Sequence, residues 1–357
     1  MAKKIDIRSD LNLVQGYHSP QVEAKVRLNA NESPFGPPSE WIDELIAQVS
    51  EIGFNRYPDR SAWQLRSAIA DIHSTVPERV FCAKGSNEVI QCLLLAYGGP
   101  GRKAVTFEPT YLLHSHISRI TGTEVSSVPR GSDFLIPMEA AYQALERQSP
   151  EITFLCSPNN PTGIAEPRES VLGIVESAPG IVVIDEAYGQ FASWSALELV
   201  TGSDPPEGVA VVRTFSKTWS MAACRLGYMV GDAELVSACE AVALPYHLDS
   251  ISQLAGVLAL QYVKEMEGRM RSVVAERKRV AMALESLGIN ALPSESNFIL
   301  FNNPRIDADT LWKRLLDKSV LVRNCASWPG LAGFLRVTIG LPEENDAFLV
   351  ALGESLG

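Results

Sequence analysis

Short apolar runs alternate with longer amphipathic segments from about residue 79 onward. The short runs are rich in β-branched residues, which is typical of strands buried on both faces of a parallel sheet. Strands are expected at 104–107, 152–155, 181–184 and 209–212, and helices at 40–49, 62–73 and 89–97. Alternation of this kind is typical of βαβ units and predicts an α/β fold.

The pattern of apolar and polar residues changes near residue 263, where a long helical periodicity begins and runs to residue 287. We expect its basic residues on a solvated face: Arg271, Arg277, Lys278 and Arg279. Further strands are predicted at 298–301, 320–322 and 334–339, with a helix near 308–317. Such a mixture within a short stretch favours a small α+β lobe.

Three parts are therefore expected along the chain. Residues 1–32 form an N-terminal arm and part of a smaller domain, residues 33–262 a large ligand-binding domain, and residues 263–357 a small C-terminal domain. A length of 357 residues suits two lobes better than one core.

Composition and charge exclude several classes of protein. The net charge of −11 argues against nucleic acid as a partner, because phosphate binding needs a basic face. No apolar run approaches the ~20 residues of a membrane span. Lys3 and Lys4 precede no apolar stretch, so we expect no signal peptide.

The six cysteines show no spacing typical of metal binding, and we expect them to be reduced thiols of a cytoplasmic enzyme. His114 and His116 lack an acidic or cysteine partner nearby in the sequence. We therefore interpret them as structural histidines and predict no metal site.

Two polar residues stand at the ends of predicted strands. Asp185 follows the run 181–184, and Lys217 comes shortly after the run 209–212. Ligands of α/β sheets bind at the carboxyl ends of the strands. A lysine and a carboxylate there suit pyridoxal phosphate, whose chemistry uses a lysine Schiff base and a carboxylate paired with the ring nitrogen.

Other residues have the right chemistry to hold a phosphate ester. Thr214, Ser216 and Arg225 supply hydroxyls and a guanidinium around Lys217. The stretch Gly85-Ser86-Asn87 precedes an apolar helix, whose N-terminal N–H groups would face the same phosphate. The sequence around Lys217 also resembles the end of a nucleotide-binding P-loop, but the upstream glycines of that motif are missing.

Three polar side chains are candidates for contacts with the cofactor ring. Tyr188 and Asn160 would hydrogen-bond its phenolic oxygen, and Tyr111 would stack on it. The alternatives are a tight turn around Asn160 and a core position for Tyr111.

Together these residues resemble the fold-type I pyridoxal-phosphate aminotransferases, and among them the histidinol-phosphate aminotransferase family. The likeness runs in order over about residues 10–352. Its motifs are 28–36, 56–59, 85–88, 157–163, 185–188, 213–217, 225–228, 296–298 and 335–340.

The resemblance implies a large domain with a mostly parallel, seven-stranded type of sheet sandwiched by helices, plus a smaller α+β domain. It implies transfer of the amino group of histidinol phosphate to 2-oxoglutarate, which gives imidazole-acetol phosphate and glutamate in histidine biosynthesis. The alternatives are an aromatic amino acid aminotransferase and a phospho-amino-acid decarboxylase of the same fold.

The resemblance also assigns roles to residues. Lys217, Asp185 and Tyr188 are expected to be catalytic. Tyr57 is expected to reach the cofactor phosphate of a partner subunit, which implies a homodimer with shared sites. The residues expected to bind substrate are Tyr17, Asn31, Asn160, Arg323 and Arg336.

Two features depart from the family pattern. The stretch 218–224 lacks the usual glycines, and Lys84 and Asn87 stand where a neutral residue and an aspartate are usual. We expect these departures to affect substrate preference rather than cofactor binding. For Arg336 the structural alternative is a salt bridge to an internal carboxylate.

Overall fold

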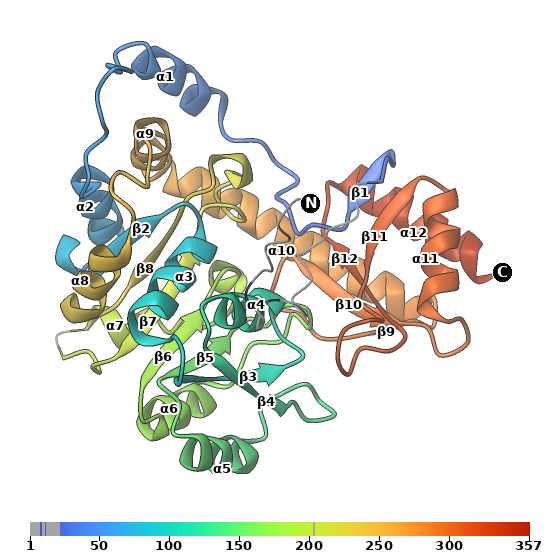
Figure 1. Ribbon diagram of the computed structural model, residues 1–357. Helices are drawn as coiled ribbons and strands as arrows, with labels where there is room; N and C mark the ends of the chain where they lie inside the picture. Colours follow the sequence, from blue (N-terminus) through green and yellow to red (C-terminus); the bar gives the residue numbers. More distant parts are fainter. Residues whose placement is uncertain (1–7, 9–10, 12–21, 203) are drawn as a thin grey trace, which may run out of the picture.

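A computed structural model describes residues 8, 11, 22–202 and 204–357 (Figure 1). A seven-stranded sheet organises the larger part of these residues, and its strands lie in the order β2-β8-β7-β6-β5-β3-β4. Within this sheet β8 runs antiparallel to its neighbours β2 and β7, and the other pairs are parallel. The strands are β2 (Val80–Ala83), β3 (Lys103–Glu108), β4 (Glu124–Pro129), β5 (Ile152–Cys156), β6 (Ile181–Asp185), β7 (Val209–Thr214) and β8 (Gly227–Val230).

Helices cover both faces of this sheet, which explains why its central strands are apolar throughout. Alternate side chains of β6 point to opposite cores: Val182 and Ile184 to one, Ile181 and Val183 to the other. The first core is closed mainly by α2 (Trp63–Ile72), α5 (Met138–Gln148), α6 (Arg168–Ser177), α7 (Leu197–Thr201) and α9 (Ser250–Ala259). The second is closed by α3 (Ser86–Tyr97), α4 (Leu112–Ile120) and α8 (Ala233–Val242). The helix α1 (Ser39–Val49) packs against α9.

A second sheet carries the C-terminal residues, in the order β1-β11-β12-β10-β9. Its strands are β1 (Val26–Leu28), β9 (Asn290–Ala291), β10 (Phe298–Asn302), β11 (Val320–Asn324) and β12 (Phe334–Thr338). It shares a core with α10 (Val263–Ser286), α11 (Ala308–Asp317) and α12 (Pro342–Leu356). The short strand β1 pairs with β11 and so belongs to the second sheet. The segment that follows β1 leads from there to α1, beside the seven-stranded sheet (Figure 1).

The fold class is confirmed, and each predicted strand and helix is present to within a few residues. The expectation for Arg277 is wrong: this side chain is buried and donates to the Ser296 carbonyl at 2.7 Å, whereas Arg271 is exposed as expected. The division of the chain at residues 33 and 263 stays a prediction.

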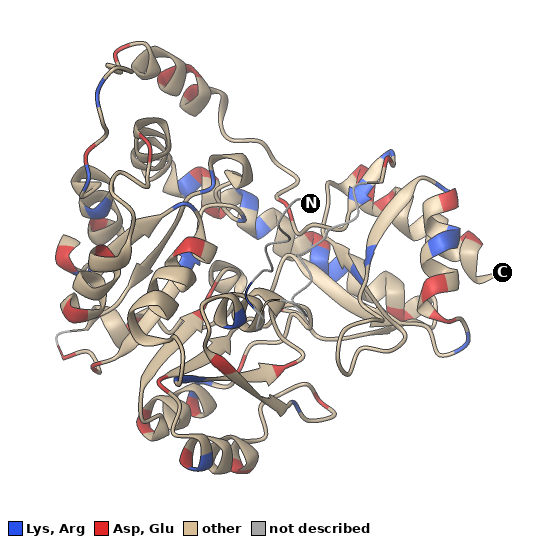
Figure 2. Cartoon of the chain, in the orientation of Figure 1, with Lys and Arg blue, Asp and Glu red and all other residues tan. Residues whose placement is uncertain are grey.

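Lys and Arg residues are interspersed with Asp and Glu residues along the outer helices (Figure 2). None of the helices in the described ranges is both long and apolar enough to cross a membrane.

Candidate active site

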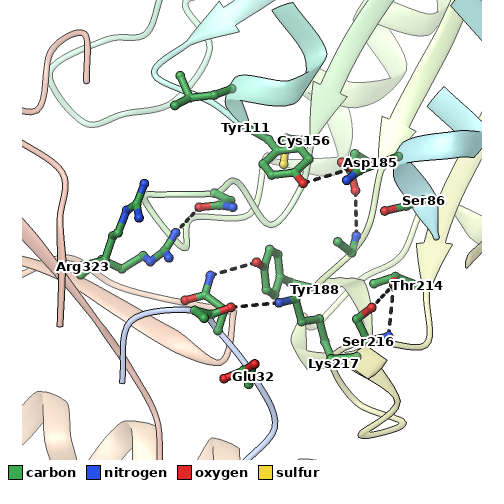
Figure 3. A pocket seen from close by; sticks show the side chains of 18 of the residues that line it. Glu32, Ser86, Tyr111, Cys156, Asp185, Tyr188, Thr214, Ser216, Lys217 and Arg323 are labelled. Atoms are coloured by element: carbon green, nitrogen blue, oxygen red, sulfur yellow. Dashed lines mark hydrogen bonds between the residues drawn. The ribbon is translucent and has the colours of Figure 1, made fainter. Parts of the chain in front are cut away.

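A cavity of about 360 Å³ lies where β5, β6 and β7 end, and residues of the second sheet close it from the other side (Figure 3). The last residues of these three strands line it: Cys156, Asp185 and Thr214. Arg323 of β11 and Arg336 of β12 reach it from the second sheet. The site thus depends on both sheets.

The cavity brings together most of the residues that the sequence singled out. Those lining it are Asn31, Ser86, Asn87, Tyr111, Asn160, Asp185, Tyr188, Thr214, Ser216, Lys217, Arg225, Arg323 and Arg336. Gly85 lies next to Ser86, at the start of α3. Tyr57 does not line this cavity; it is 79% exposed and its ring stacks on that of Tyr246 at 4.3 Å. Tyr17 lies outside the described residues.

One end of the cavity is a cradle of hydrogen-bond donors. It contains the N-terminus of α3, which no side chain caps, and Ser86 and Asn87 of its first turn line the cavity. Gly85 has φ +87°, and a Cβ there would stand 3.0 Å from the Arg225 guanidinium. The Ser216 hydroxyl accepts two hydrogen bonds, from the Arg225 guanidinium at 3.4 Å and from the Thr214 hydroxyl at 3.0 Å. A guanidinium, hydroxyls and a helix N-terminus are together suited to a phosphate group.

Arg225 itself has a left-handed backbone, with φ 51°. This conformation is unfavourable for a residue other than glycine and persists where the surroundings hold it in place. Here it places the guanidinium over Gly85.

The carboxylate of Asp185 is held from two sides. The Ala187 N–H donates to one oxygen at 3.0 Å, and His114 Nε2 lies 3.0 Å from the other. Because a carboxylate only accepts, His114 carries the proton on Nε2 and donates it. The buried His114 ring stacks on Phe154 at 4.8 Å and meets Tyr111 edge-on at 5.4 Å.

His114 is therefore a neighbour of the candidate site that the sequence reasoning missed. The expectation of an ordinary structural histidine overlooked its contact with a predicted catalytic residue. The available signal was its position, three residues after Tyr111 and on the first turn of α4. Within the described part of the chain no cluster of residues suited to a metal ion is found.

Lys217 is partly exposed to the cavity, and its ammonium donates to the Ala30 carbonyl at 3.2 Å. Burial lowers its pKa to about 8, and the positive charges of Arg336 and Arg225 act in the same direction, opposed by Glu32. A lysine in such surroundings is readily available as the neutral amine.

The side-chain amides of two asparagines each hold a polar group of the cavity in place. Asn31 donates to the Tyr188 hydroxyl oxygen at 2.9 Å, and burial raises the pKa of Tyr188, so this phenol keeps its own proton to donate. The Asn160 carbonyl oxygen accepts from Arg336 at 2.5 Å. The amide nitrogen of Asn160 is thereby left for a further acceptor.

Arg336 is only 5% exposed and makes no salt bridge with any described carboxylate. Its second hydrogen bond goes to the Asn29 carbonyl at 3.1 Å, and its Nε has no partner among the described residues. Arg323 stands directly opposite on the neighbouring strand, with its guanidinium 5.8 Å from the Trp328 ring. A buried guanidinium without a carboxylate favours an anion as its partner.

The departures from the family pattern lie mostly outside the cavity. Lys84 pairs with Asp249 and donates to the Ser252 hydroxyl at 2.8 Å, so it ties the end of β2 to the start of α9. Asn87 lines the cavity and accepts from the Tyr111 hydroxyl at 3.1 Å. Within 218–224, Ala222 alone is a lining residue.

Comparisons with known proteins agree with this geometry. Residues 23–352 match the family described as aminotransferase class I and II. The chain is 44% identical to a histidinol-phosphate aminotransferase of Corynebacterium efficiens, over 99% of this chain and 95% of that protein. It is 40% identical to that of Mycobacterium avium, over 97% and 88% of the two chains. The crystal structure of the Sinorhizobium meliloti enzyme with pyridoxal-5'-phosphate superimposes with a TM-score of 0.84 at 23% identity, over 94% of this chain and 91% of that one, and supports the fold.

Proposed function

The chain belongs to the aminotransferase class I and II family, and we propose that it is a pyridoxal-phosphate-dependent histidinol-phosphate aminotransferase. In this proposal the amino group of histidinol phosphate passes to 2-oxoglutarate, giving imidazole-acetol phosphate and glutamate in histidine biosynthesis. One observation carries it: a single cavity joins a phosphate cradle, a lysine with a lowered pKa and a pair of arginines.

The residues present fit pyridoxal phosphate. The uncapped start of α3, together with Ser216 and Arg225, would hold its phosphate. Asp185 would hold the proton of the ring nitrogen, and Tyr188 and Asn160 would donate to the phenolic oxygen. When bound, this cofactor supplies an electron sink for negative charge on the substrate α-carbon and carries the amino group between the two substrates.

The residues of the chain have separate tasks. Lys217, whose pKa lies at about 8, would remove the proton from the substrate α-carbon as a neutral amine and return it at the next step. His114 fixes the carboxylate of Asp185, which would direct its charge at the ring nitrogen of the bound cofactor. The Tyr188 phenol keeps its proton and acts as a hydrogen-bond donor.

The two arginines would bind the anionic end of both substrates. Arg336 and Arg323 oppose each other on adjacent strands. A guanidinium accepts phosphate and carboxylate in the same two-pronged way, which suits a site that takes histidinol phosphate in one half of the reaction and glutamate in the other.

We place the protein in the cytoplasm as a homodimer with shared active sites. All six cysteines are free thiols, which supports a reducing compartment. Tyr57, Tyr246 and Leu244 are exposed, with Leu244 at 75%, and the rings of Tyr57 and Tyr246 stack on each other, so a partner subunit that covered them would bury apolar surface. Tyr57 would reach the partner's cofactor phosphate.

The test is an assay of the purified protein with histidinol phosphate and with phenylalanine, each with 2-oxoglutarate as acceptor. We expect glutamate formation with a strong preference for histidinol phosphate. A preference for phenylalanine would favour an aromatic aminotransferase, and release of carbon dioxide from a phosphorylated amino acid would favour a decarboxylase.

A further inference from the structure

More cationic than acidic side chains line the cavity, and the two acidic ones differ in whether they already have hydrogen-bond partners. Among the described lining residues, the cations are Lys217, Arg225, Arg323 and Arg336, and the carboxylates are Asp185 and Glu32. Asp185 is 1% exposed and already accepts from His114 and the Ala187 N–H. Glu32 is exposed to the cavity, so it is the carboxylate available to a substrate.

Glu32 is held in place by its backbone rather than by its side chain. It follows Asn31, whose side chain binds Tyr188 and whose carbonyl accepts from Asn297 at 3.1 Å. In the described part of the chain no hydrogen bond or ion pair engages the Glu32 carboxylate. Its charge nevertheless acts on Lys217, and Figure 3 shows it on the Lys217 side of the cavity. Among the described residues, Glu32 is thus a preplaced acceptor whose carboxylate has no protein partner.

We propose that Glu32 binds the imidazole ring of the amino substrate and thereby selects it. This inference rests on the proposed function. The α-carbon of histidinol phosphate carries an amine, a phosphate arm and an imidazole arm. The amine must come to Lys217, and the phosphate to Arg336 and Arg323. The imidazole arm is left for the wall that carries Glu32, where the ring N–H would meet a carboxylate that no described residue engages.

The chemistry matches this assignment. An imidazole N–H donating to a carboxylate is a charge-assisted hydrogen bond, stronger than a neutral one. Protonation of the ring, whose ordinary pKa is about 6.5, would add an ion pair. Glutamate and 2-oxoglutarate have no such ring and bring a second carboxylate instead, which Glu32 repels.

The two halves of the reaction therefore provide opposite expectations for one variant. Glu32→Gln should raise KM for histidinol phosphate about tenfold, the effect of losing one hydrogen bond to a charged group. The same change should leave KM for glutamate unchanged or lower it. A ringless amine, 2-aminopropyl phosphate, should be used equally well by the wild-type protein and the variant.

Two further variants complete the experiment. Glu32→Asp keeps the carboxylate and should retain most of the preference for the ring. Glu124→Gln, which removes an exposed charge on the edge strand β4, should change none of the three KM values.

The outcomes separate this inference from the proposed function. If Glu32→Gln changed KM for all three amines equally, Glu32 would act only through its charge near Lys217. That result would overturn the proposal that Glu32 binds the imidazole ring. An unchanged preference for histidinol phosphate would overturn it as well. If the wild-type protein does not use histidinol phosphate at all, the proposed function fails and this inference fails with it.

Discussion

His114 Nε2 lies 3.0 Å from the Asp185 carboxylate, and both side chains are buried. The imidazole and the Ala187 N–H together leave Asp185 with a fixed orientation at the end of β6. The histidine ring is itself fixed, because it stacks on Phe154. A chain of contacts thus runs from the apolar core to the carboxylate that faces the cavity.

His114→Phe should weaken cofactor binding while preserving the fold. Phenylalanine retains the stacking surface but cannot donate a hydrogen bond, and losing a bond to a charged group costs about 1.5–3 kcal/mol. We expect the cofactor dissociation constant, measured by equilibrium dialysis, to rise by tenfold or more. His114→Gln can still donate and should recover part of the affinity. Equal affinities in all three proteins would make His114 a packing residue only.

Asp185→Asn should keep the fold and lose several kcal/mol of transition-state stabilisation, because a neutral amide cannot hold the proton of the ring nitrogen. The measurement is kcat/KM for histidinol phosphate, with thermal unfolding as the check on folding. Near-normal turnover would show that Asp185 is not the partner of the ring nitrogen.

Cofactor capture by the apoprotein should depend on pH through Lys217. Only the neutral amine reacts, so the rate should rise with pH up to about 8 and then level off. Arg336→Gln removes a positive charge that lowers this pKa, so its curve should move to higher pH. The rate is followed by the absorbance of the bound cofactor.

The same lysine is identified chemically. Borohydride reduction followed by peptide mapping should find the cofactor on Lys217, and Lys217→Ala should abolish transamination. Attachment to another lysine would refute the assignment.

The two arginines should differ in their effects on the two substrates. Arg336→Gln should weaken the binding of both histidinol phosphate and 2-oxoglutarate by roughly 2–5 kcal/mol, since it removes a buried charge partner. Arg323→Gln should affect the phosphate substrate more, because a dianion uses a second guanidinium better than a carboxylate does. Small, equal effects of both changes would favour the aromatic aminotransferase.

Shared active sites would be detected by mixing two inactive variants. Subunits with Tyr57→Phe and subunits with Lys217→Ala should form hybrids in which one site carries neither change. We expect activity to return on mixing, with light scattering as the measure of the dimer. A fully active monomer would contradict the proposal.

The sequence by itself determined the local parts of this protein. Asp185 and Lys217 could be placed after their strands because the runs 181–184 and 209–212 are apolar and β-branched, a signal contained in neighbouring residues. A helix was predicted near 308–317 from a signal that is likewise local, and the structure has it at Ala308–Asp317. The ordered motifs then identified the family, since each is short and continuous.

Tertiary structure alone decided which distant residues meet. His114 looked structural because its partner Asp185 is 71 residues away, and the hydrogen bond between Arg336 and Asn160 spans 176 residues. Glu32 did not stand out, because it gains significance only when β1 joins the second sheet and the chain after it crosses the cavity. Periodicity records whether a side chain faces water or a core, but the partner that it meets there depends on how the elements pack.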